Sequence, residues 1–432
     1  MLLVSRSVYF INVIAPNFSV ILRSAAMTAP LVSFCIPTFN RARYLDSLLS
    51  TLGEHLQDFP FSYEVFVGDN ASEDETSAVV AKYADWPALR VVRHEENLGG
   101  AVNWQYLLTH ARGRYFVYVA DDDCLLAPEV ANVIQMMERQ PSVGVVYAPW
   151  KLFDLVSDQD LGQFYHLKED VLVRQGDFGQ LLDILLTHRV FPEIAIYRRD
   201  VLLDVMPRVH EQAFYAFVHA AEFVQHGDVA FLKDPFYVSI TNYFVDHQRQ
   251  QAGNGEAEYA WDRYRAGLEH VLGRAIQQIT PQQRVEFTLR IQDMITERMS
   301  VAVRMRVGNQ RDAIETYYLA YRLRALGGEH LLPVDLGTLA TTAALQFLTR
   351  DQELNRGITQ LVCLGEYPQA LRALIDAKAA VPVHYTNEVT CLQGLDESIL
   401  VLLRTGHEKA ALPSDCRARL VFERNLMSKF AG

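Results

Sequence analysis

From residue 31 the chain alternates short apolar runs with segments of helical spacing. The apolar runs LVSFCIP, YEVFVGD, LRVVRH and YFVYVADDD have the length and composition of buried strands. Between them lie RYLDSLLSTLGEHL, SEDETSAVVAKYA and GGAVNWQYLLTHA, whose apolar positions recur every three or four residues and predict helices. This alternation is typical of βαβ units, so the sequence predicts an α/β fold with a mostly parallel sheet flanked by helices.

The same pattern continues less regularly to about residue 250. A helix is predicted over 128–139 and a strand at VGVVYAPW. EIAIYRRDVL reads as a strand followed by a helix, FYAFVHAAEFVQH as a helix ended by Gly227, and DVAFLKDPFYVS as a strand interrupted at Pro235. We therefore expect one α/β domain over residues 31–250.

Beyond residue 256 the spacing is helical almost throughout. Six segments carry it: YAWDRYRAGLEHVLGRAIQQI, QRVEFTLRIQDMITERMSVAVRMRV, RDAIETYYLAYRLRAL, DLGTLATTAALQFLT, ELNRGITQLVCLG and PQALRALIDAKAA. The polar stretch QRQQAGNGEAE precedes them and is interpreted as a linker. The sequence thus predicts an α-helical C-terminal domain over residues 256–432.

Residues 1–30 form an apolar N-terminal extension that precedes the first predicted strand. The apolar stretch before Pro16 is too short to span a bilayer, and Met27 offers an alternative start for the native protein. No later run reaches the ~18 apolar residues of a membrane-spanning helix. We expect no integral membrane segment.

Charge and cysteine content narrow the function classes. The chain has 40 Lys and Arg against 52 Asp and Glu, a net charge of −12, which argues against a nucleic-acid partner. Its cysteines lie without paired spacing, which predicts reduced thiols and a cytoplasmic protein; they are Cys35, Cys124, Cys363, Cys391 and Cys416.

Three polar clusters, PTFN, GDNASED and ADDD, follow predicted strands. In open parallel sheets the carboxyl ends of the strands meet at one edge, which is where ligands bind. Asp69, in the second cluster, is predicted to accept hydrogen bonds from a nucleobase N–H or ribose hydroxyl, and Asp74 to cap the following helix. The clusters therefore predict a ligand site at this edge.

The third cluster contains Asp121, Asp122 and Asp123. Such carboxylates can bind Mg²⁺ or Mn²⁺ together with water and a substrate diphosphate. If the strand direction persists, alternation places Asp121 and Asp123 on one side, so the pattern acts as D-x-D and Asp122 faces away. The alternative is an acidic loop that only caps the next helix, which begins near Pro128.

Together these motifs resemble a family 2 glycosyltransferase with the GT-A fold. VSFCIPTFNRARYL, YEVFVGDNASEDET, NLGGAVNW, the ADDD turn with PEVANVI, and HGDVAFLKDP occur in the family's order and at similar intervals. The resemblance covers roughly residues 31–250 and does not reach the helical tail. It implies an inverting, metal-assisted transferase that moves a sugar from a nucleoside diphosphate, most readily UDP, to a saccharide or lipid-linked hydroxyl acceptor in cell-surface polysaccharide synthesis.

The resemblance also implies roles for individual residues. The nucleotide-sugar site would contain the segment around the first strand end, the Asp69 carboxylate and the first two aspartates of the triplet, with two asparagines of NLGGAVNW beside the nucleotide. These positions are Pro37, Thr38, Asp69, Asn97, Asn103, Asp121 and Asp122. Asp123 would bind the metal, and His247 would be a second metal ligand or a phosphate contact. The two asparagines are equally interpreted as turn and helix-cap residues.

The catalytic base is where the sequence departs from the family. Relatives often carry an acidic pair before the glycine that corresponds to Gly227, whereas this chain has FYAFVHAAEFVQHG. A base must be unprotonated and within ~3 Å of the acceptor hydroxyl. Candidates are Glu211, His219 and Glu222.

Three other interpretations stay open. The missing acidic pair is compatible with a degenerate transferase that acts as a binding or scaffold protein. A D-x-D phosphohydrolase would use Asp121 as nucleophile and Asp123 as acid and base, but it expects the motif on its first strand. The tail segment ERMSVAVRMRVGNQR could place arginines on an anionic membrane surface, giving peripheral membrane contact; they are Arg298, Arg304, Arg306 and Arg311.

Overall fold

The computed structural model describes residues 29–206, 213–245, 252–350, 355–404 and 412–430. The chain divides into two compact units. The first holds most of the chain up to Val171 together with Ile194–Asp204 and Ala230–Tyr243, and the second holds Leu172–Glu193, Val205–Val229 and the residues from Phe244 onward.

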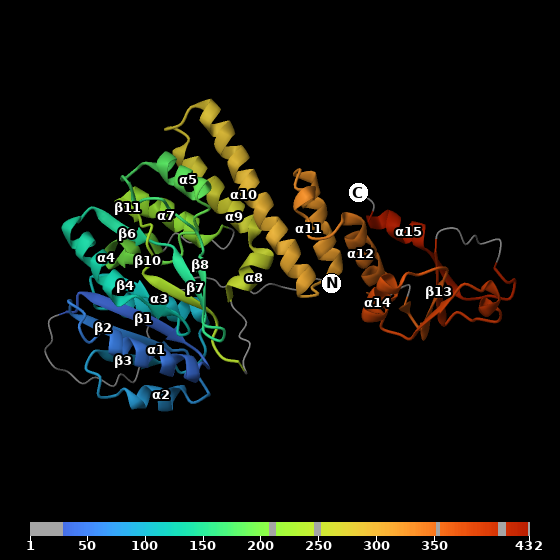
Figure 1. The fold of residues 1–432 in the computed structure, drawn as a ribbon, viewed down its shortest axis with the longest axis horizontal. Coiled ribbons are helices and arrows are strands. Elements are labelled where there is room, and N and C mark those ends of the chain that lie inside the picture. Colours follow the sequence, from blue (N-terminus) through green and yellow to red (C-terminus); the bar gives the residue numbers. More distant parts are fainter. Residues whose placement is uncertain (1–28, 207–212, 246–251, 351–354, 405–411, 431–432) are drawn as a thin grey trace. The chain divides into compact units, whose positions relative to one another are not determined.

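A mostly parallel sheet dominates the first unit (Figure 1). Its strand order is β3-β2-β1-β4-β10-β6-β11-β9. The four strands β3, β2, β1 and β4 pair in parallel, and β10 is antiparallel to both β4 and β6. The bounds are β1 Val32–Thr38, β2 Tyr63–Asp69, β3 Leu89–Arg93, β4 Tyr115–Tyr118, β6 Val143–Tyr147, β9 Val171–Val173, β10 Ala195–Arg198 and β11 Asp228–Phe231.

The helices that connect these strands fall where the apolar periodicity predicts them. Helix α1 buries Leu45, Leu48, Leu49 and Leu52 on one face because those positions recur every three or four residues. The connecting helices are α1 Ala42–His55, α2 Thr76–Lys82, α3 Gly100–His110, α4 Ala127–Arg139 and α6 Arg199–Val205. The expected α/β class with a mostly parallel sheet flanked by helices is confirmed.

A second sheet lies beside the aspartate turn. Its order is β5-β12-β7-β8, with bounds β5 Cys124–Leu125, β7 Trp150–Asp154, β8 Gln159–Gln163 and β12 Tyr237–Asn242. Strand β12 pairs antiparallel with β5, which directly follows the aspartates, and parallel with β7. A chain segment more than 100 residues away in sequence therefore supports the turn.

The second unit begins its helical part with long antiparallel helices (Figure 1). Helix α10 opens with a capping box in which Thr280 and Gln283 exchange hydrogen bonds. The bounds are α5 Phe178–Thr187, α7 Tyr215–His226, α8 Ala252–Tyr259, α9 Trp261–Ala275, α10 Pro281–Gly308, α11 Ala313–Ala325 and α12 Leu336–Arg350. Part of the stretch interpreted as a linker is therefore helix α8.

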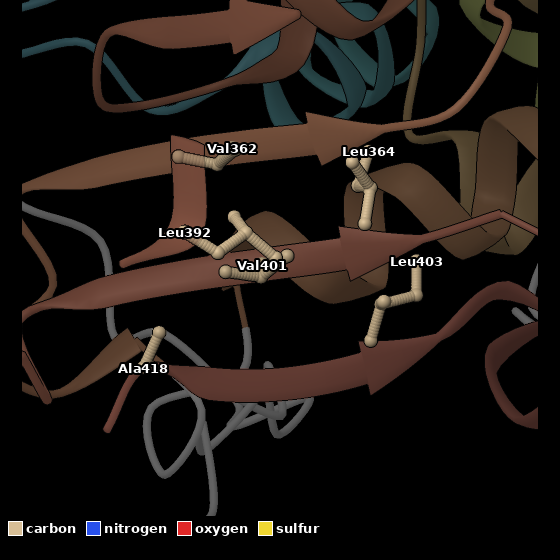
Figure 2. Close-up of a cluster of buried hydrophobic side chains, with 6 residues drawn as sticks. All are labelled: Val362, Leu364, Leu392, Val401, Leu403 and Ala418. Carbon is tan, nitrogen blue, oxygen red and sulfur yellow. The ribbon is translucent and has the colours of Figure 1, made fainter. Parts of the chain in front are cut away.

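The expected helical C-terminal region is present as far as α12, but beyond α12 the expectation of helices is wrong. The segment ELNRGITQLVCLG, predicted as a helix, contains strand β13, and a parallel sheet forms in the order β14-β13-β15-β16. Figure 2 shows its core of Val362, Leu364, Leu392, Val401, Leu403 and Ala418. The bounds are β13 Gln360–Leu364, α14 Gln369–Lys378, β14 Val383–Thr386, β15 Ile399–Leu403, β16 Arg419–Phe422 and α15 Glu423–Met427.

Candidate functional site

The ends of β1, β2 and β4 bring the predicted site residues together. Thr38 lies opposite Asp69 in the register of β1 and β2, and Pro37 lies opposite Gly68. On the other side of β1, the hydroxyl of Thr38 donates a hydrogen bond to Oδ2 of Asp121 at 2.8 Å. The carboxyl edge of three adjacent parallel strands thus carries a threonine and two aspartates, as the sequence predicts.

The aspartate triplet forms a turn instead of continuing the strand. Strand β4 ends at Tyr118, and Nη1 of Arg41 contacts both Oδ1 of Asp121 at 3.0 Å and Oδ2 of Asp122 at 2.5 Å. The expectation that Asp122 faces away is wrong: the side chain is buried and shares a guanidinium group with Asp121. The reason is that the two-residue alternation of a strand no longer applies once the chain turns.

Asp123 has a separate set of partners on β12. The hydroxyl of Tyr237 donates to Oδ2 of Asp123 at 2.9 Å, and the backbone amide of Ile240 donates to Oδ1 at 2.9 Å. The same Tyr237 oxygen accepts a hydrogen bond from the amide of Ala120 at 3.1 Å. The third aspartate is thereby fixed at the base of the turn.

Burial makes the negative charges of this turn energetically costly. The exposed fractions of Asp121, Asp122 and Asp123 are 4%, 5% and 9%. Burial raises the pKa of Asp123 to about 6, and the neighbouring charge of Asp121 adds to the rise, against the hydrogen bonds from β12. Asp121 and Asp122 share the guanidinium group of Arg41, whereas Asp123 accepts from Tyr237 and Ile240; carboxylates gathered in this way favour a cation.

The donor atoms of this turn fit a hard divalent cation. They are carboxylate oxygens, the ligands that Mg²⁺ and Mn²⁺ prefer. In the described parts of the chain, no group of three or more His, Cys, Asp or Glu side chains is arranged to hold a metal ion. A cation here would take only one or two protein ligands and complete its shell with water and phosphate oxygens. His247, the predicted second ligand, lies outside the described residues.

Asp69 is the second buried carboxylate of the edge. Its Oδ1 accepts a hydrogen bond from the amide of Ser72 at 2.9 Å, and its Oδ2 pairs with Nη1 of Arg93 at 2.7 Å. Nη2 of Arg93 also donates to the carbonyl oxygen of Ser72. The sequence analysis did not single out either arginine, although Arg41 lies within the motif VSFCIPTFNRARYL and Arg93 within the strand run LRVVRH.

The two asparagines of NLGGAVNW have different environments. Asn103 is buried, where its amide nitrogen donates to the carbonyl oxygen of Gly68 at 2.7 Å and its Oδ1 lies 3.0 Å from Nε2 of His94. Asn97 lies in the preceding loop, and its Oδ1 accepts hydrogen bonds from the side chain of Asn70 and the amide of Gly99. Asn103 therefore ties α3 to β2, whereas Asn97 lies at the exposed edge.

Asp74 behaves as predicted for a helix cap. Its Oδ1 accepts a hydrogen bond from the amide of Thr76, the first residue of α2, and its Oδ2 accepts one from the amide of Ala42, the first residue of α1. These bonds lower the pKa of Asp74, against the opposing effect of its partial burial. One carboxylate thus stabilises the starts of two helices.

The candidate bases belong to the second unit, and those described are buried. Glu222 on α7 pairs with Arg274 at 3.0 Å and lies 3.6 Å from His270, both on α9. His219, one turn earlier, is 5% exposed, and burial lowers its pKa to about 4. Their surroundings are those of packed helix residues, and neither side chain is open to an acceptor. Glu211 lies outside the described residues.

The basic segment of α10 does not form an exposed stripe. Arg306 is buried against Tyr259 and pairs with Glu315, while Arg311 pairs with the buried Glu258. The guanidinium group of Arg298 lies over the ring of Phe191. Arg298 and Arg306 are thus used inside the unit, whereas Arg304 and Arg311 are exposed. No helix within the described ranges is long and apolar enough to cross a membrane.

The sheet defines an α/β domain whose polar carboxyl edge lies where such domains bind ligands. Residues 33–205 match the family model described as glycosyl transferase family 2. The match covers less than half of the chain and confirms the resemblance to this family that is seen in the motifs.

Individual relatives match shorter segments. An uncharacterized glycosyltransferase of Haemophilus influenzae is 26% identical over 121 residues, which cover 28% of this chain and 39% of the relative. Abequosyltransferase RfbV of Salmonella typhimurium is 30% identical over 115 residues, or 26% of this chain and 34% of the relative. The matched segments thus span less than two-fifths of these curated relatives.

A solved structure with similarity over a longer range is that of Staphylococcus aureus TarS, residues 1–349, in complex with UDP-GlcNAc. It is 17% identical, covers 72% of this chain and 90% of that chain, and gives a TM-score of 0.42.

Proposed function

We propose that this chain is a glycosyltransferase that moves a sugar from a nucleoside diphosphate to a hydroxyl group of a saccharide acceptor, with inversion at the anomeric carbon. The observation that carries the proposal is the meeting of Thr38, Asp69 and the aspartate turn at the edge of three parallel strands in a family 2 domain. The names of two relatives support sugar transfer: abequosyltransferase RfbV, and the poly(ribitol-phosphate) beta-N-acetylglucosaminyltransferase TarS of Staphylococcus aureus. We place this transfer in cell-surface polysaccharide synthesis as part of the proposal.

In this proposal each carboxylate has its own task. Asp69, fixed by Arg93 and the amide of Ser72, accepts hydrogen bonds from the nucleobase, and Asp121, fixed by Thr38, lies on the ribose side. Asp123 and its neighbours in the turn hold the divalent cation. When bound, that cation offsets the negative charge that develops on the leaving diphosphate.

A separate group must act as the base that takes the proton from the hydroxyl of the saccharide acceptor. Glu222 holds α7 against α9 through Arg274, and His219 is buried, so both are better explained as packed helix residues. The base of this proposal is therefore left unassigned among the described residues, and Glu211 stays a prediction. An inverting reaction still requires one, because the attacking hydroxyl loses its proton as the new bond forms.

A thermal-shift panel of UDP, GDP and dTDP, each with and without Mn²⁺, tests the proposal. We expect one nucleotide to raise the melting temperature in a Mn²⁺-dependent way, because ligands that bind only the folded state stabilise it. Asp123→Asn should abolish the Mn²⁺-dependent part. Asp85→Asn changes an exposed carboxylate elsewhere in the same unit and should leave the response unchanged. Failure of every nucleotide to shift the wild type contradicts the proposal.

The burial of both described base candidates favours a second function, a degenerate transferase that binds nucleotide sugars without turnover. Slow hydrolysis of a nucleotide sugar to free sugar and nucleoside diphosphate separates the two. Metal-dependent release of the diphosphate supports the enzyme. Nucleotide binding without any release, with or without saccharide acceptors, supports the binding protein.

A further inference from the structure

Arg41 is the cation that the fold itself places at the aspartate turn. It directly precedes α1, and its carbonyl oxygen accepts hydrogen bonds from the amides of Tyr44 and Leu45 at 3.1 and 3.0 Å. The flanking amides of Asn40 and Ala42 donate to the side chains of Ser72 and Asp74. The backbone that carries Arg41 is thus fixed between the loops that follow β1 and β2.

The side chain uses only part of its hydrogen-bonding capacity. Nη1 contacts both Asp121 and Asp122, and the side chain is 33% exposed. Within the described ranges, Nε and Nη2 of Arg41 make no hydrogen bond that meets normal geometric criteria. A guanidinium group offers its five N–H donors in a planar fork, which suits two oxygens of a phosphate group.

We propose that Arg41 is a diphosphate-binding residue, which donates from Nε and Nη2 to phosphate oxygens of the sugar donor while Nη1 keeps the aspartate turn in place. This inference rests on the proposed function and assigns a phosphate contact that the motifs did not identify. It also explains why one nitrogen serves two carboxylates, because the rest of the guanidinium group stays directed to a ligand.

The charges of the site agree with this assignment. Asp121, Asp122 and Asp123 gather three buried carboxylates at the turn, and carboxylates by themselves repel a diphosphate. A divalent cation removes the excess negative charge, and Arg41 then adds directional N–H donors that a metal ion lacks. Phosphate recognition would therefore be divided between the cation and Arg41.

A purely structural role predicts a different pattern of binding. If Arg41 only held Asp121 and Asp122 in place, its loss would disturb the whole pocket and weaken nucleoside and nucleotide alike. A phosphate contact predicts a loss confined to ligands that carry the diphosphate. Uridine and UDP therefore separate the two roles.

The test measures the affinities of uridine and UDP at saturating Mn²⁺, by ligand-observed NMR and calorimetry, for the wild type, Arg41→Met and Arg41→Lys. If the thermal-shift panel selects GDP or dTDP, that nucleotide and its nucleoside are used. We expect Arg41→Met to weaken the affinity for UDP at least about tenfold, which is the usual scale of a charge-assisted hydrogen bond. The affinity for uridine should change less than about twofold. Arg41→Lys should be intermediate, because it keeps the charge but not the fork.

Arg43→Met is the matched control, since Arg43 is an exposed arginine on the first turn of the same helix. It should leave both affinities at wild-type values. Equal weakening of uridine and UDP in Arg41→Met, or no change in either, overturns the inference while wild-type binding of UDP upholds the proposed function. Absence of nucleotide binding by the wild type overturns both.

Discussion

The phenol of Tyr237 holds the carboxylate of Asp123 although the two residues are 114 positions apart in the sequence. The oxygen of Tyr237 bridges the start and the end of the aspartate turn, because it accepts from the amide of Ala120 and donates to Asp123. The turn therefore depends on strand β12 as much as on its own sequence.

Replacing Tyr237 by phenylalanine removes both bonds and leaves a buried amide and a buried carboxylate without these partners. We expect the free energy of unfolding to fall by about 1–3 kcal/mol, the usual range for an unsatisfied buried group. We also expect the Mn²⁺-dependent stabilisation by nucleotide to shrink, since Asp123 is no longer fixed. Chemical denaturation and the thermal-shift panel measure the two effects.

Tyr243→Phe is the control for that variant. Tyr243 follows the same strand, and its hydroxyl bonds to Ser47 at 2.6 Å. Loss of this hydrogen bond should lower the stability of the protein without changing the thermal shift that the nucleotide produces. Identical nucleotide responses of the two variants would show that Tyr237 does not position the site.

Glu222→Gln distinguishes a structural carboxylate from a catalytic base. We expect the free energy of unfolding to fall by about 1–3 kcal/mol, a value reduced from that of fully buried pairs because Arg274 is 31% exposed. Donor turnover, normalised to folded protein, should stay within about twofold of wild type, whereas loss of a general base costs 10²–10⁴-fold. A loss of turnover on that scale with unchanged stability would make Glu222 the base.

His219 makes the protein sensitive to acid. Burial lowers its pKa from 6.5 to about 4, so the folded state disfavours the protonated form. Its contribution to stability is present above pH 6.5 and is lost as the pH falls towards 4. Compared with His219→Leu, the wild type should lose about 2 kcal/mol between pH 7.5 and pH 5, the cost of protonating a group with this shift.

Denaturant unfolding at these pH values, with the difference taken between the two proteins, measures that loss. A difference independent of pH would mean that His219 is already accessible to solvent. The same outcome would restore it as a candidate base.

Gly68 is required by the close approach of α3 to β2. A Cβ atom at this position would lie 2.4 Å from Oδ1 of Asn103 and 3.1 Å from Leu107. We expect Gly68→Ala to destabilise the protein by about 1–3 kcal/mol through overpacking, measured by urea unfolding. Gly53→Ala, in the interior of α1 with open space around it, should instead stabilise by up to about 1 kcal/mol. Equal effects would show that Asn103 moves away freely.

The sequence predicted the strands and helices of the first unit well, because the apolar spacing there matches the elements that form. It also placed Thr38, Asp69 and Asp121 at one edge, since parallel strands end on the same side. It failed at Asp122, where a turn replaced the assumed alternation. The partner of Asp123 was not predictable either, because no local pattern identifies a tyrosine 114 residues away as its hydrogen-bond donor.

In the C-terminal tail, prediction from sequence failed for a different reason. QLVCL is a short apolar run without alternation, and such a run fits a buried strand and a buried helix segment equally well. Its helical neighbours favoured the wrong choice, whereas the pairing of β13 with β14 and β15 decides the structure. Nonlocal pairing of this kind leaves little trace in one segment.

The carboxylate of Asp74 connects the starts of helices α1 and α2 in the first unit. Because a single carboxylate bonds the first amides of both α1 and α2, fraying of one helix removes an anchor from the other. The two helix starts are separated by 34 positions, yet they share this contact. Their amide protons should therefore exchange with solvent as one cooperative opening unit, not as two independent helix ends.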